Sequence, residues 1–249
     1  MKFAPIVHLI GMLLCILSIF MLIPALVDWF YGSNDWPAFI FSSFLTGLIG
    51  SFFYFSAKNN STEHLELRQA FLLTNSAWLS IALFGSLPFL FSQINMSFVD
   101  ALFESTSGIT TTGATVITNL DNTSHGILIW RALLQWLGGV GIIVMALAIL
   151  PMLSIGGMQL FKTESYETPD KVVPKAATFA AGISIVYSIL TIAWALMLWK
   201  AGMPVFDSIA HAMTTLATGG YSTKSSSLAA FDSSTCLLYT SDAADDGTG

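Results

Sequence analysis

Five long apolar segments constrain the fold of this chain more than any other feature of its sequence. A helix that crosses the apolar core of a bilayer, about 30 Å thick, needs about 20 mostly apolar residues, and it satisfies its own backbone hydrogen bonds in lipid. Segments of this kind are residues 3–27, 36–57, 69–91, 126–150 and 176–199, with an extension of the fourth to Phe161 as an alternative. Only 10% of the residues are charged, whereas soluble domains contain about 25%. The sequence therefore predicts an all-α membrane protein, and its first segment is too long for a cleaved signal peptide.

The distribution of Lys and Arg predicts a cytoplasmic N-terminus, because cytoplasmic loops carry an excess of these residues. In this orientation six of the nine lie on the cytoplasmic side: Lys2, Lys58, Arg68, Lys162, Lys171 and Lys175. Arg131, Lys200 and Lys224 lie at or near the outer surface. Two semi-polar stretches, 97–119 and 204–223, are then on the outer side of the membrane.

The two semi-polar stretches repeat one pattern. VDALFESTSGITTTGAT (99–115) and FDSIAHAMTTLATGGYS (206–222) align without gaps at an offset of 107 residues. The alignment pairs Asp100 with Asp207, Leu102 with Ile209, Thr111 with Thr218 and Gly113 with Gly220. Each copy has a helix-compatible stretch of about eleven residues, which rises about 16 Å or half a bilayer. Irregular backbone at that depth is tolerated only inside protein or beside water, so the repeat indicates two pore loops.

The Thr/Gly turn of each copy has the chemistry of a cation site. Rings of backbone carbonyls can replace the hydration shell of a potassium ion, and glycine adopts the backbone angles that aim successive carbonyls at one axis. A single Thr-Thr-Gly sequence is typical of an ordinary polar loop. Two copies, each after a half-membrane helix and between spanning helices, favour a pore.

At this point the chain resembles the TrkH family of the Trk/Ktr/HKT potassium transporter superfamily. The segments that resemble it are DALFESTSGITTTGATVI, WRALLQWLGGVGIIVMALAILPMLSIGGMQLF and DSIAHAMTTLATGGYST, and the resemblance covers about residues 1–232. It implies two additional N-terminal helices followed by four repeats of helix, pore loop and helix around one pore. The expected parts are an extension (1–67), a complete first repeat (68–161), a cytoplasmic loop (162–175), an incomplete second repeat (176–232) and a disordered or foreign tail (233–249).

The resemblance implies potassium uptake across a bacterial inner membrane, passive or coupled, with potassium as the transported ligand and no cofactor. Potassium would be bound by backbone oxygens at Thr111, Thr112, Thr218 and Gly219, with Gly113 and Gly220 as the filter glycines. In an alternative register, shifted by one residue, Gly219 would match Gly113, and Ala217 and Thr218 would be the ligands. The ungapped register is preferred. Implied partners are membrane lipid, a cytoplasmic nucleotide-binding subunit of the TrkA type that docks on the inner face, and a second copy in a homodimer, with no nucleic acid. The 151–175 loop is on the correct side of the membrane for the TrkA-type contact.

The C-terminal segment departs from the family. After FDSS the sequence continues as TCLLYTSDAADDGTG, and CLLYTSDAAD resembles a translated library adapter. We expect a truncation by a sequencing artefact. The alternative is a naturally short half-channel that needs partner chains, or a fragment that does not conduct. A polytopic membrane enzyme is a remote alternative, because the spans contain no acid pair, metal-ligand spacing or evident nucleophile with its base.

Several polar residues and glycines have two interpretations each. Arg131 shares a helix face with Gln135, and a structural or interfacial role is favoured because such cations usually snorkel. Glu104, which matches His211, either concentrates cations at the outer mouth or bonds to backbone behind the turn. Gly138, Gly139 and Gly141 favour close helix packing over a hinge. His8 and His211 are expected to be hydrogen-bonded structural residues rather than metal ligands or groups that titrate in function.

Overall fold

The computed structural model describes residues 3–57, 67–153 and 172–231, and this part of the chain contains helices and no strand. The long helices are α1 (Ala4–Tyr31), α2 (Trp36–Ala57), α3 (Leu67–Gly85), α6 (His125–Leu153) and α8 (Val172–Lys200). The short ones are α4 (Leu87–Phe91), α5 (Phe98–Ile109), α9 (Val205–Leu216) and the 3-10 turns η2 (Leu120–Asn122) and η4 (Ser227–Ala230).

Five helical segments are long and apolar enough to cross a membrane, which confirms the five predicted spans. Their bounds are Ala4–Tyr31, Trp36–Ala57, Arg68–Phe91, His125–Ile143 and Ala180–Lys200. The chain is therefore an all-α membrane protein. The predicted extension of the fourth span to Phe161 lies outside the described residues.

Some predicted boundaries differ from the structure. The first helix continues four residues past 27 because Asp28 is buried against α6 instead of meeting water, and it ends at Gly32 in the left-handed conformation (φ 71°). The third span is divided, since α3 ends at Gly85 and α4 begins at Leu87. Residues 172–175, assigned to the 162–175 loop, are the first residues of α8. The rest of that loop and the 233–249 tail lie outside the described residues.

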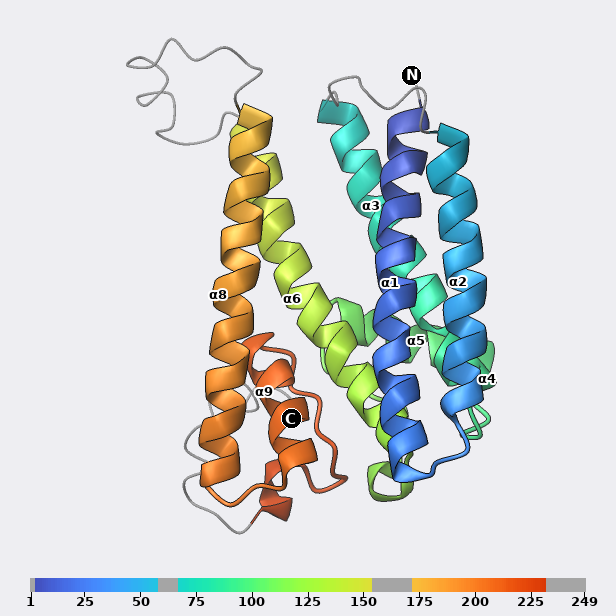
Figure 1. Cartoon of the computed structure of the whole chain (residues 1–249), viewed down its shortest axis with the longest axis vertical. Helices are drawn as coiled ribbons and strands as arrows, with labels where there is room; N and C mark the ends of the chain where they lie inside the picture. Colours follow the sequence, from blue (N-terminus) through green and yellow to red (C-terminus); the bar gives the residue numbers. More distant parts are fainter. Residues whose placement is uncertain (1–2, 58–66, 154–171, 232–249) are drawn as a thin grey trace.

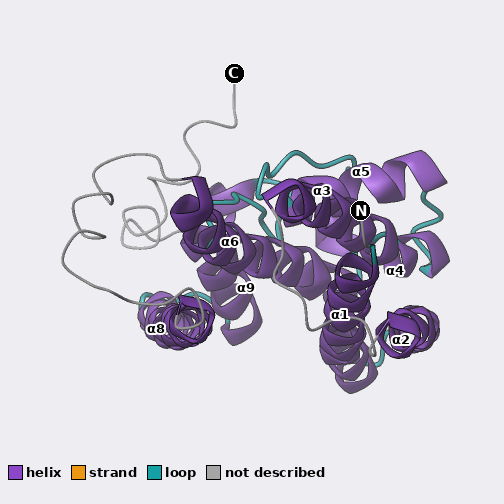
Figure 2. Cartoon of the chain, turned by 90° about the horizontal axis from the view of Figure 1, so that it is seen from above, coloured by secondary structure: helices purple, strands orange, loops and turns teal. Residues whose placement is uncertain are grey.

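The helices form two groups joined by α6 (Figure 1). α1 and α2 make an antiparallel hairpin on one side, packed so closely that a Cβ on Gly11 would lie 2.7 Å from the Gly50 carbonyl oxygen. α8 stands on the other side, and the view from above also separates it from the hairpin (Figure 2). α5 and α9 both lie toward the end of the molecule where α1 turns into α2, which we call the α9 end.

α6 is the central helix of this arrangement. Within its membrane-length window 61% of the residues are buried, against 17% for the window in α8. Trp130 is fully buried, and its Nε1–H donates to the Gly85 carbonyl oxygen at 3.0 Å, where α3 ends. Contacts of α6 with α1, α3, α5, α8 and α9 make it the frame on which the repeated motif is mounted.

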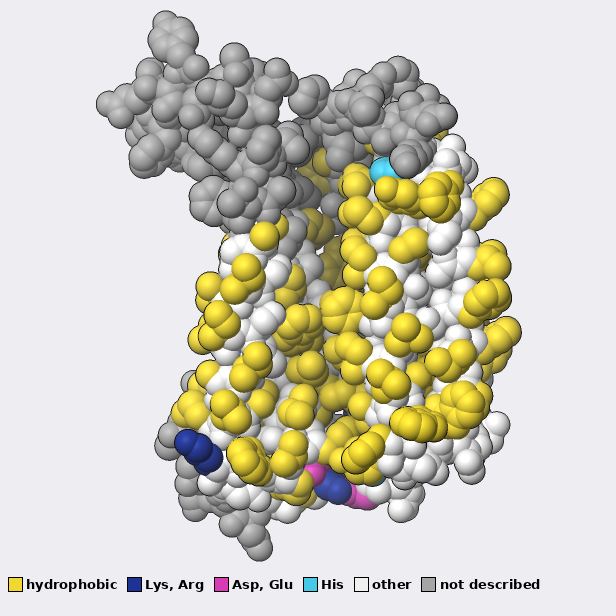
Figure 3. Space-filling view, viewed as in Figure 1, with side chains coloured by type: hydrophobic (Ala, Val, Ile, Leu, Met, Phe, Trp, Pro, Cys, Tyr) yellow, Lys and Arg dark blue, Asp and Glu magenta, His cyan; other side chains and the backbone are white. Residues whose placement is uncertain are grey.

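The flanks of the bundle are apolar. Figure 3 shows hydrophobic side chains along α1, α2 and α8, whereas the visible Lys, Arg, Asp and Glu side chains gather at the α9 end. Phe30, Phe52 and Leu79 are among the large apolar side chains that are more than two-thirds exposed. Such an extended apolar surface is suited to lipid.

Candidate functional site

The repeated motif forms two short helices of equal length. α5 and α9 both have 12 residues, and they begin 107 positions apart, at Phe98 and Val205. The Ser97 hydroxyl oxygen accepts a bond from the Asp100 N–H at 3.2 Å, which satisfies one of the free donors at the start of α5. Each helix also has an acid in its first turn, Asp100 or Asp207, at the positive end of the helix dipole. The two sequence copies therefore adopt the same local fold.

The turns that follow α5 and α9 have the same backbone hydrogen bonds. In the first turn the N–H groups of Thr110, Thr111 and Thr112 donate to the carbonyls of Thr106, Gly108 and Ser107. In the second turn the N–H groups of Ala217, Thr218 and Gly219 donate to the carbonyls of Met213, Thr215 and Thr214. Every donor and every acceptor in one turn has its counterpart 107 residues away in the other.

The turns also share left-handed residues at matched positions. The φ angles are 57° at Thr111 and 81° at Gly113 in the first turn, and 52° at Thr218 and 76° at Gly220 in the second. A left-handed conformation is a genuine outlier for a β-branched residue such as threonine. Backbone of this kind costs about 1–3 kcal/mol and clusters at functional sites, where the surrounding structure holds it. Two equivalent threonines in this conformation mark the turns as the candidate site.

The two turns lie against each other. A Cβ placed on Gly113 would be 2.1 Å from the Gly219 carbonyl oxygen, so only glycine fits at position 113. Thr218 and Gly220 are exposed, whereas Gly219 between them is buried. The structure thus brings together all six residues predicted for the site: Thr111, Thr112, Gly113, Thr218, Gly219 and Gly220.

Gln135 on α6 holds the second turn from behind. Its Nε2–H donates to the Gly219 carbonyl oxygen at 2.7 Å, and its Oε1 accepts from the Tyr221 N–H at 3.2 Å. A Cβ on Gly219 would lie 2.3 Å from the Gln135 side chain. Glycine is therefore needed at the two neighbouring positions for different reasons. Gly220 adopts a positive φ, and Gly219 leaves room for the Gln135 side chain.

A buried ion pair connects the two turns. Arg131 Nε–H donates to Glu104 Oε1 at 2.7 Å, and their side chains are 1% and 0% exposed. The Glu104 carboxylate also accepts from the Thr115 hydroxyl and the Val116 N–H, just after the first turn. Arg131 Nη1–H donates to the Ser222 carbonyl oxygen at 2.9 Å, just after the second. The two buried charges thus pair with each other, as burial in a low dielectric requires, and Arg131 Nη2 has no hydrogen-bond partner among the described residues.

Tyr221 fills the space between the ion pair and the turns. Its ring centroid lies 4.0 Å from the Arg131 guanidinium carbon, a cation–π contact. Its hydroxyl lies 3.0 Å from the Glu104 carbonyl oxygen and 3.1 Å from that of Ala114. A residue of the second repeat therefore supports the helix and turn of the first.

His211 occupies the position in the second repeat that Glu104 has in the first. Its Nδ1–H donates to the Asp207 carbonyl oxygen at 2.8 Å, which leaves Nε2 to accept from the Ser222 hydroxyl at 3.0 Å. Ser222 matches Thr115 at the offset of 107 residues. In each repeat a side chain therefore joins the short helix to the segment after its turn. This side chain is the Glu104 carboxylate in the first repeat and the His211 imidazole in the second.

These contacts decide between the alternative interpretations of single residues. Glu104 lies behind the turns and has no exposed surface, so the interpretation as a cation collector at the outer mouth was wrong. Arg131 is structural, but it does not snorkel, because Glu104 offers a carboxylate inside the protein. Gly138 permits close packing, since a Cβ there would lie 2.0 Å from the Ile109 carbonyl oxygen. His8 is hydrogen-bonded to the Tyr54 carbonyl at 3.1 Å, as expected.

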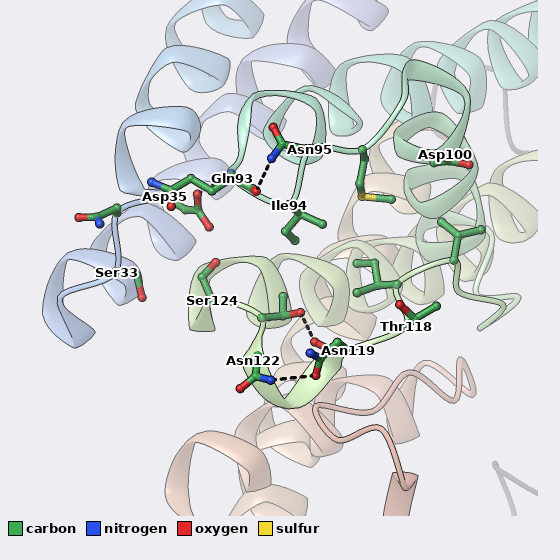
Figure 4. A pocket seen from close by; sticks show the side chains of 15 residues that line it. Ser33, Asp35, Gln93, Ile94, Asn95, Asp100, Thr118, Asn119, Asn122 and Ser124 are labelled. Atoms are coloured by element: carbon green, nitrogen blue, oxygen red, sulfur yellow. Dashed lines mark hydrogen bonds between the residues drawn. The ribbon is translucent and has the colours of Figure 1, made fainter.

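A polar cavity of about 600 Å³ lies at the α9 end. It is lined by Asp35 from the α1–α2 turn, Asp100 from α5, and amide and hydroxyl side chains such as Asn95, Asn119 and Ser124 (Figure 4). Within the described residues no three His, Cys, Asp or Glu side chains gather as metal ligands would. The sequence did not predict this cavity, which is lined in part by the segment after the first turn, residues 116–119.

Comparison with known proteins identifies the family. The model of the TrkH family, described as cation transport proteins, matches residues 36–241. The chain belongs to the TrkH family.

Individual members of the TrkH family are similar over nearly the whole chain. The Trk system potassium uptake protein TrkH of Salmonella typhimurium is 42% identical over 238 residues, which are 94% of this chain and 49% of that protein. TrkI of Halomonas elongata is 38% identical and covers 96% of this chain and 48% of the relative. The crystal structure of the potassium transporter TrkH from Vibrio parahaemolyticus has a TM-score of 0.87 at 40% identity, covering 98% of this chain and 49% of that one. The chain spans about half the length of the relatives it matches.

The sequence did not predict the contacts of the α6 face that carries Arg131 and Gln135, nor those of Tyr221. The sequence showed that Arg131 and Gln135 share a helix face, but not that this face meets Glu104 and both turns. Tyr221 had no signal beyond its place after the second turn. The repeat pairs Glu104 with His211, and this pairing was the available signal that both side chains bond to the segment after their turn. Equivalent positions in a repeat tend to have equivalent surroundings.

Proposed function

We propose that the chain supplies two of the filter strands of a potassium-translocating pore. Potassium is bound by backbone oxygens at Thr111, Thr112, Thr218 and Gly219, and Gly113 and Gly220 provide the conformation of the turns. The observation that carries the proposal is the pair of left-handed threonines with matched hydrogen bonds. Turns of this kind direct successive backbone oxygens toward one side, as a filter requires. The potassium transport named for the relatives supports the choice of ion.

The matched backbone angles support the ungapped register. In that register both left-handed residues of one turn fall on left-handed residues of the other. The alternative would pair Gly113 with Gly219, which is buried and lies against Gln135. Gly219 stays in the proposed ligand set, because a carbonyl oxygen has two lone pairs and Gln135 occupies one.

A glycine substitution tests the filter directly. In Gly113→Ala the new methyl group meets the Gly219 carbonyl, and the positive φ is strained for alanine. The matched control is Gly182→Ala in α8, where a Cβ has nothing within 4 Å. Both variants are made in the gene that encodes this chain, at its native length, and expressed in cells that lack other potassium uptake. We expect Gly113→Ala to lose potassium uptake or potassium-over-sodium selectivity while Gly182→Ala keeps both. Equal uptake and selectivity in both would refute the filter assignment.

The length of the expressed chain tests the alternative of a fragment that does not conduct. The 249-residue chain is expressed beside the product of the whole gene. If the gene encodes further repeats, uptake by its whole product alone assigns conduction to a pore with further filter segments. Uptake by the 249-residue chain requires assembly of several copies, which cross-linking would show.

The orientation and partners are proposed with the function. The N-terminus faces the cytoplasm of a bacterium, the protein lies in the inner membrane, and a homodimer binds a TrkA-type nucleotide-binding subunit on its cytoplasmic face. The Lys and Arg distribution supports this orientation. Labelling of single cysteines from outside intact cells tests it, and failure of the native-length protein to co-purify with a TrkA-type subunit would remove that partner.

A further inference from the structure

Asp28 is a buried carboxylate on α1, outside both repeats. It has 0% exposure, and its Oδ1 accepts from the Gly126 N–H at 2.6 Å, in the first turn of α6. We propose that Asp28 is a positioning residue for the filter: it fixes the start of α6 and thereby the places at which Arg131 and Gln135 hold the two turns. The inference rests on the proposed function and extends it to the N-terminal hairpin.

Two adjacent contacts join the end of α1 to the start of α6. The carboxylate of Asp28 meets a free N–H of α6 at the positive end of its dipole, where an anion is most favourable. One turn later on α1, the Tyr31 ring stacks on His125 with centroids 3.9 Å apart and an interplanar angle of 5°. Phe206 of α9 packs edge-on against His125 at 4.7 Å. The end of α1 thus contacts the first residues of α6, and its aromatic cluster reaches the start of α9.

Gly126 shows how closely the carboxylate is fitted. A Cβ on Gly126 would lie 2.2 Å from Asp28 Oδ2, so any larger residue would displace the carboxylate. The contact is therefore specified from both sides, by an acid on α1 and by a glycine on α6.

The path from Asp28 to the turns runs along one helix. Gly126 is five residues before Arg131 and nine before Gln135, so the whole path is about 14 Å of continuous α-helix. Arg131 reaches Glu104 and the Ser222 carbonyl, and Gln135 reaches the Gly219 carbonyl and the Tyr221 N–H. A shift of the start of α6 moves both side chains together, because a helix is stiff along its axis.

The test uses the native-length gene product and four variants. Asp28→Ala removes the acceptor, Asp28→Asn keeps an oxygen that can accept from Gly126, and Gly126→Ala displaces the carboxylate from the other side. Leu26→Ala is the control, since this α1 side chain is 64% exposed. The readouts are the half-saturating potassium concentration and the potassium-over-sodium ratio of uptake, at equal amounts of protein in the membrane.

We expect Asp28→Ala and Gly126→Ala to raise the half-saturating concentration or lower the selectivity ratio by about fivefold, the lower end of typical coupling between linked sites. Asp28→Asn should recover most of the change, and Leu26→Ala should have no effect. If the variants lower only the maximal rate or the amount of protein, Asp28 has a merely structural role and the inference is wrong.

Hydrogen exchange separates this inference from the proposed function. In Asp28→Ala, exchange of the backbone N–H groups in residues 107–117 and 214–224 should be faster than in the wild type and in Leu26→Ala. This readout needs no transport. A wild type that does not transport potassium would refute the proposed function, whereas unchanged exchange at the turns would refute the positioning role.

Discussion

At the scale of single residues, the buried ion pair of Glu104 and Arg131 is the contact shared by both turns. Removing one member of a buried pair leaves an uncompensated charge and costs about 3–5 kcal/mol, whereas removing both costs much less. Here the pair also serves both turns, through Val116 and Ser222. Its loss should therefore affect the stability of the protein and the order of the turns together.

We predict that Arg131→Met destabilises the purified protein by about 3–5 kcal/mol, because the buried Glu104 carboxyl would lose its cationic partner. Glu104→Gln with Arg131→Met should restore part of this loss, since no unpaired charge remains. A double-mutant cycle from thermal unfolding in detergent measures the coupling. If Arg131→Met is as stable as the wild type, the pair is not important for stability.

At the scale of elements, α6 depends on close backbone contact with α5. Gly138 faces the Ile109 carbonyl, at the end of the helix that precedes the first turn. Gly139 faces Tyr187 and Ala217, at the end of the helix that precedes the second. Two neighbouring glycines thus allow one helix to approach both turns, which small residues permit in membrane helices generally.

We predict that Gly138→Ala destabilises the protein by about 1–3 kcal/mol, the usual cost of overpacking, and disturbs the first turn. The Ile109 carbonyl belongs to backbone and cannot rotate away from the new methyl group. Gly141→Ala is the matched control, because its nearest atom would be Trp78 at 4.0 Å. Thermal unfolding of both variants checks the difference, and equal stabilities would contradict the packing interpretation.

The elements were largely predictable, and the contacts among them were not. Membrane length and apolarity determined the five spans, and the repeat located α5 and α9 because half-membrane helices leave a distinct polar pattern. The break at Ser86 is marked in the sequence by Gly85 and Pro88. It was not predicted, because the membrane length of residues 69–91 favoured one continuous span. The structural role of Arg131 was favoured, but its burial was not predicted, because its carboxylate partner is 27 residues away in the sequence and only the folded chain shows that they meet.

At the scale of the whole molecule, the two repeats are linked at the α9 end as well as behind the turns. Asp121 of the first repeat contacts the Ser225 N–H at 3.4 Å and Lys224 Nζ at 3.8 Å. The Ser225 side chain also accepts from the Leu120 N–H at 3.2 Å. This link is exposed, so salt and pH can act on it.

We predict that this link weakens in acid. Hydrogen bonding from the Ser225 side chain, with smaller effects of the Ser225 N–H and Lys224, lowers the pKa of the Asp121 carboxyl below its ordinary value of 3.8. A lowered pKa in the folded state stabilises the protein above 3.8, and this stabilisation is lost as pH falls through the folded value. Asp121→Asn should remove that part of the pH dependence. Melting temperatures of both proteins across the acid range provide the check, and parallel curves would exclude a contribution from Asp121.

The position of Gln135 has a consequence for synthesis. The chain is made from its N-terminus, and domains generally fold in that order. Asp28 is made before Gly126, and Arg131 and Gln135 are made before residues 219–222, which they hold. In each of these contacts the later segment therefore meets a partner that has already been synthesised. When the second turn is synthesised, the α6 side chains that bind it are already part of the chain.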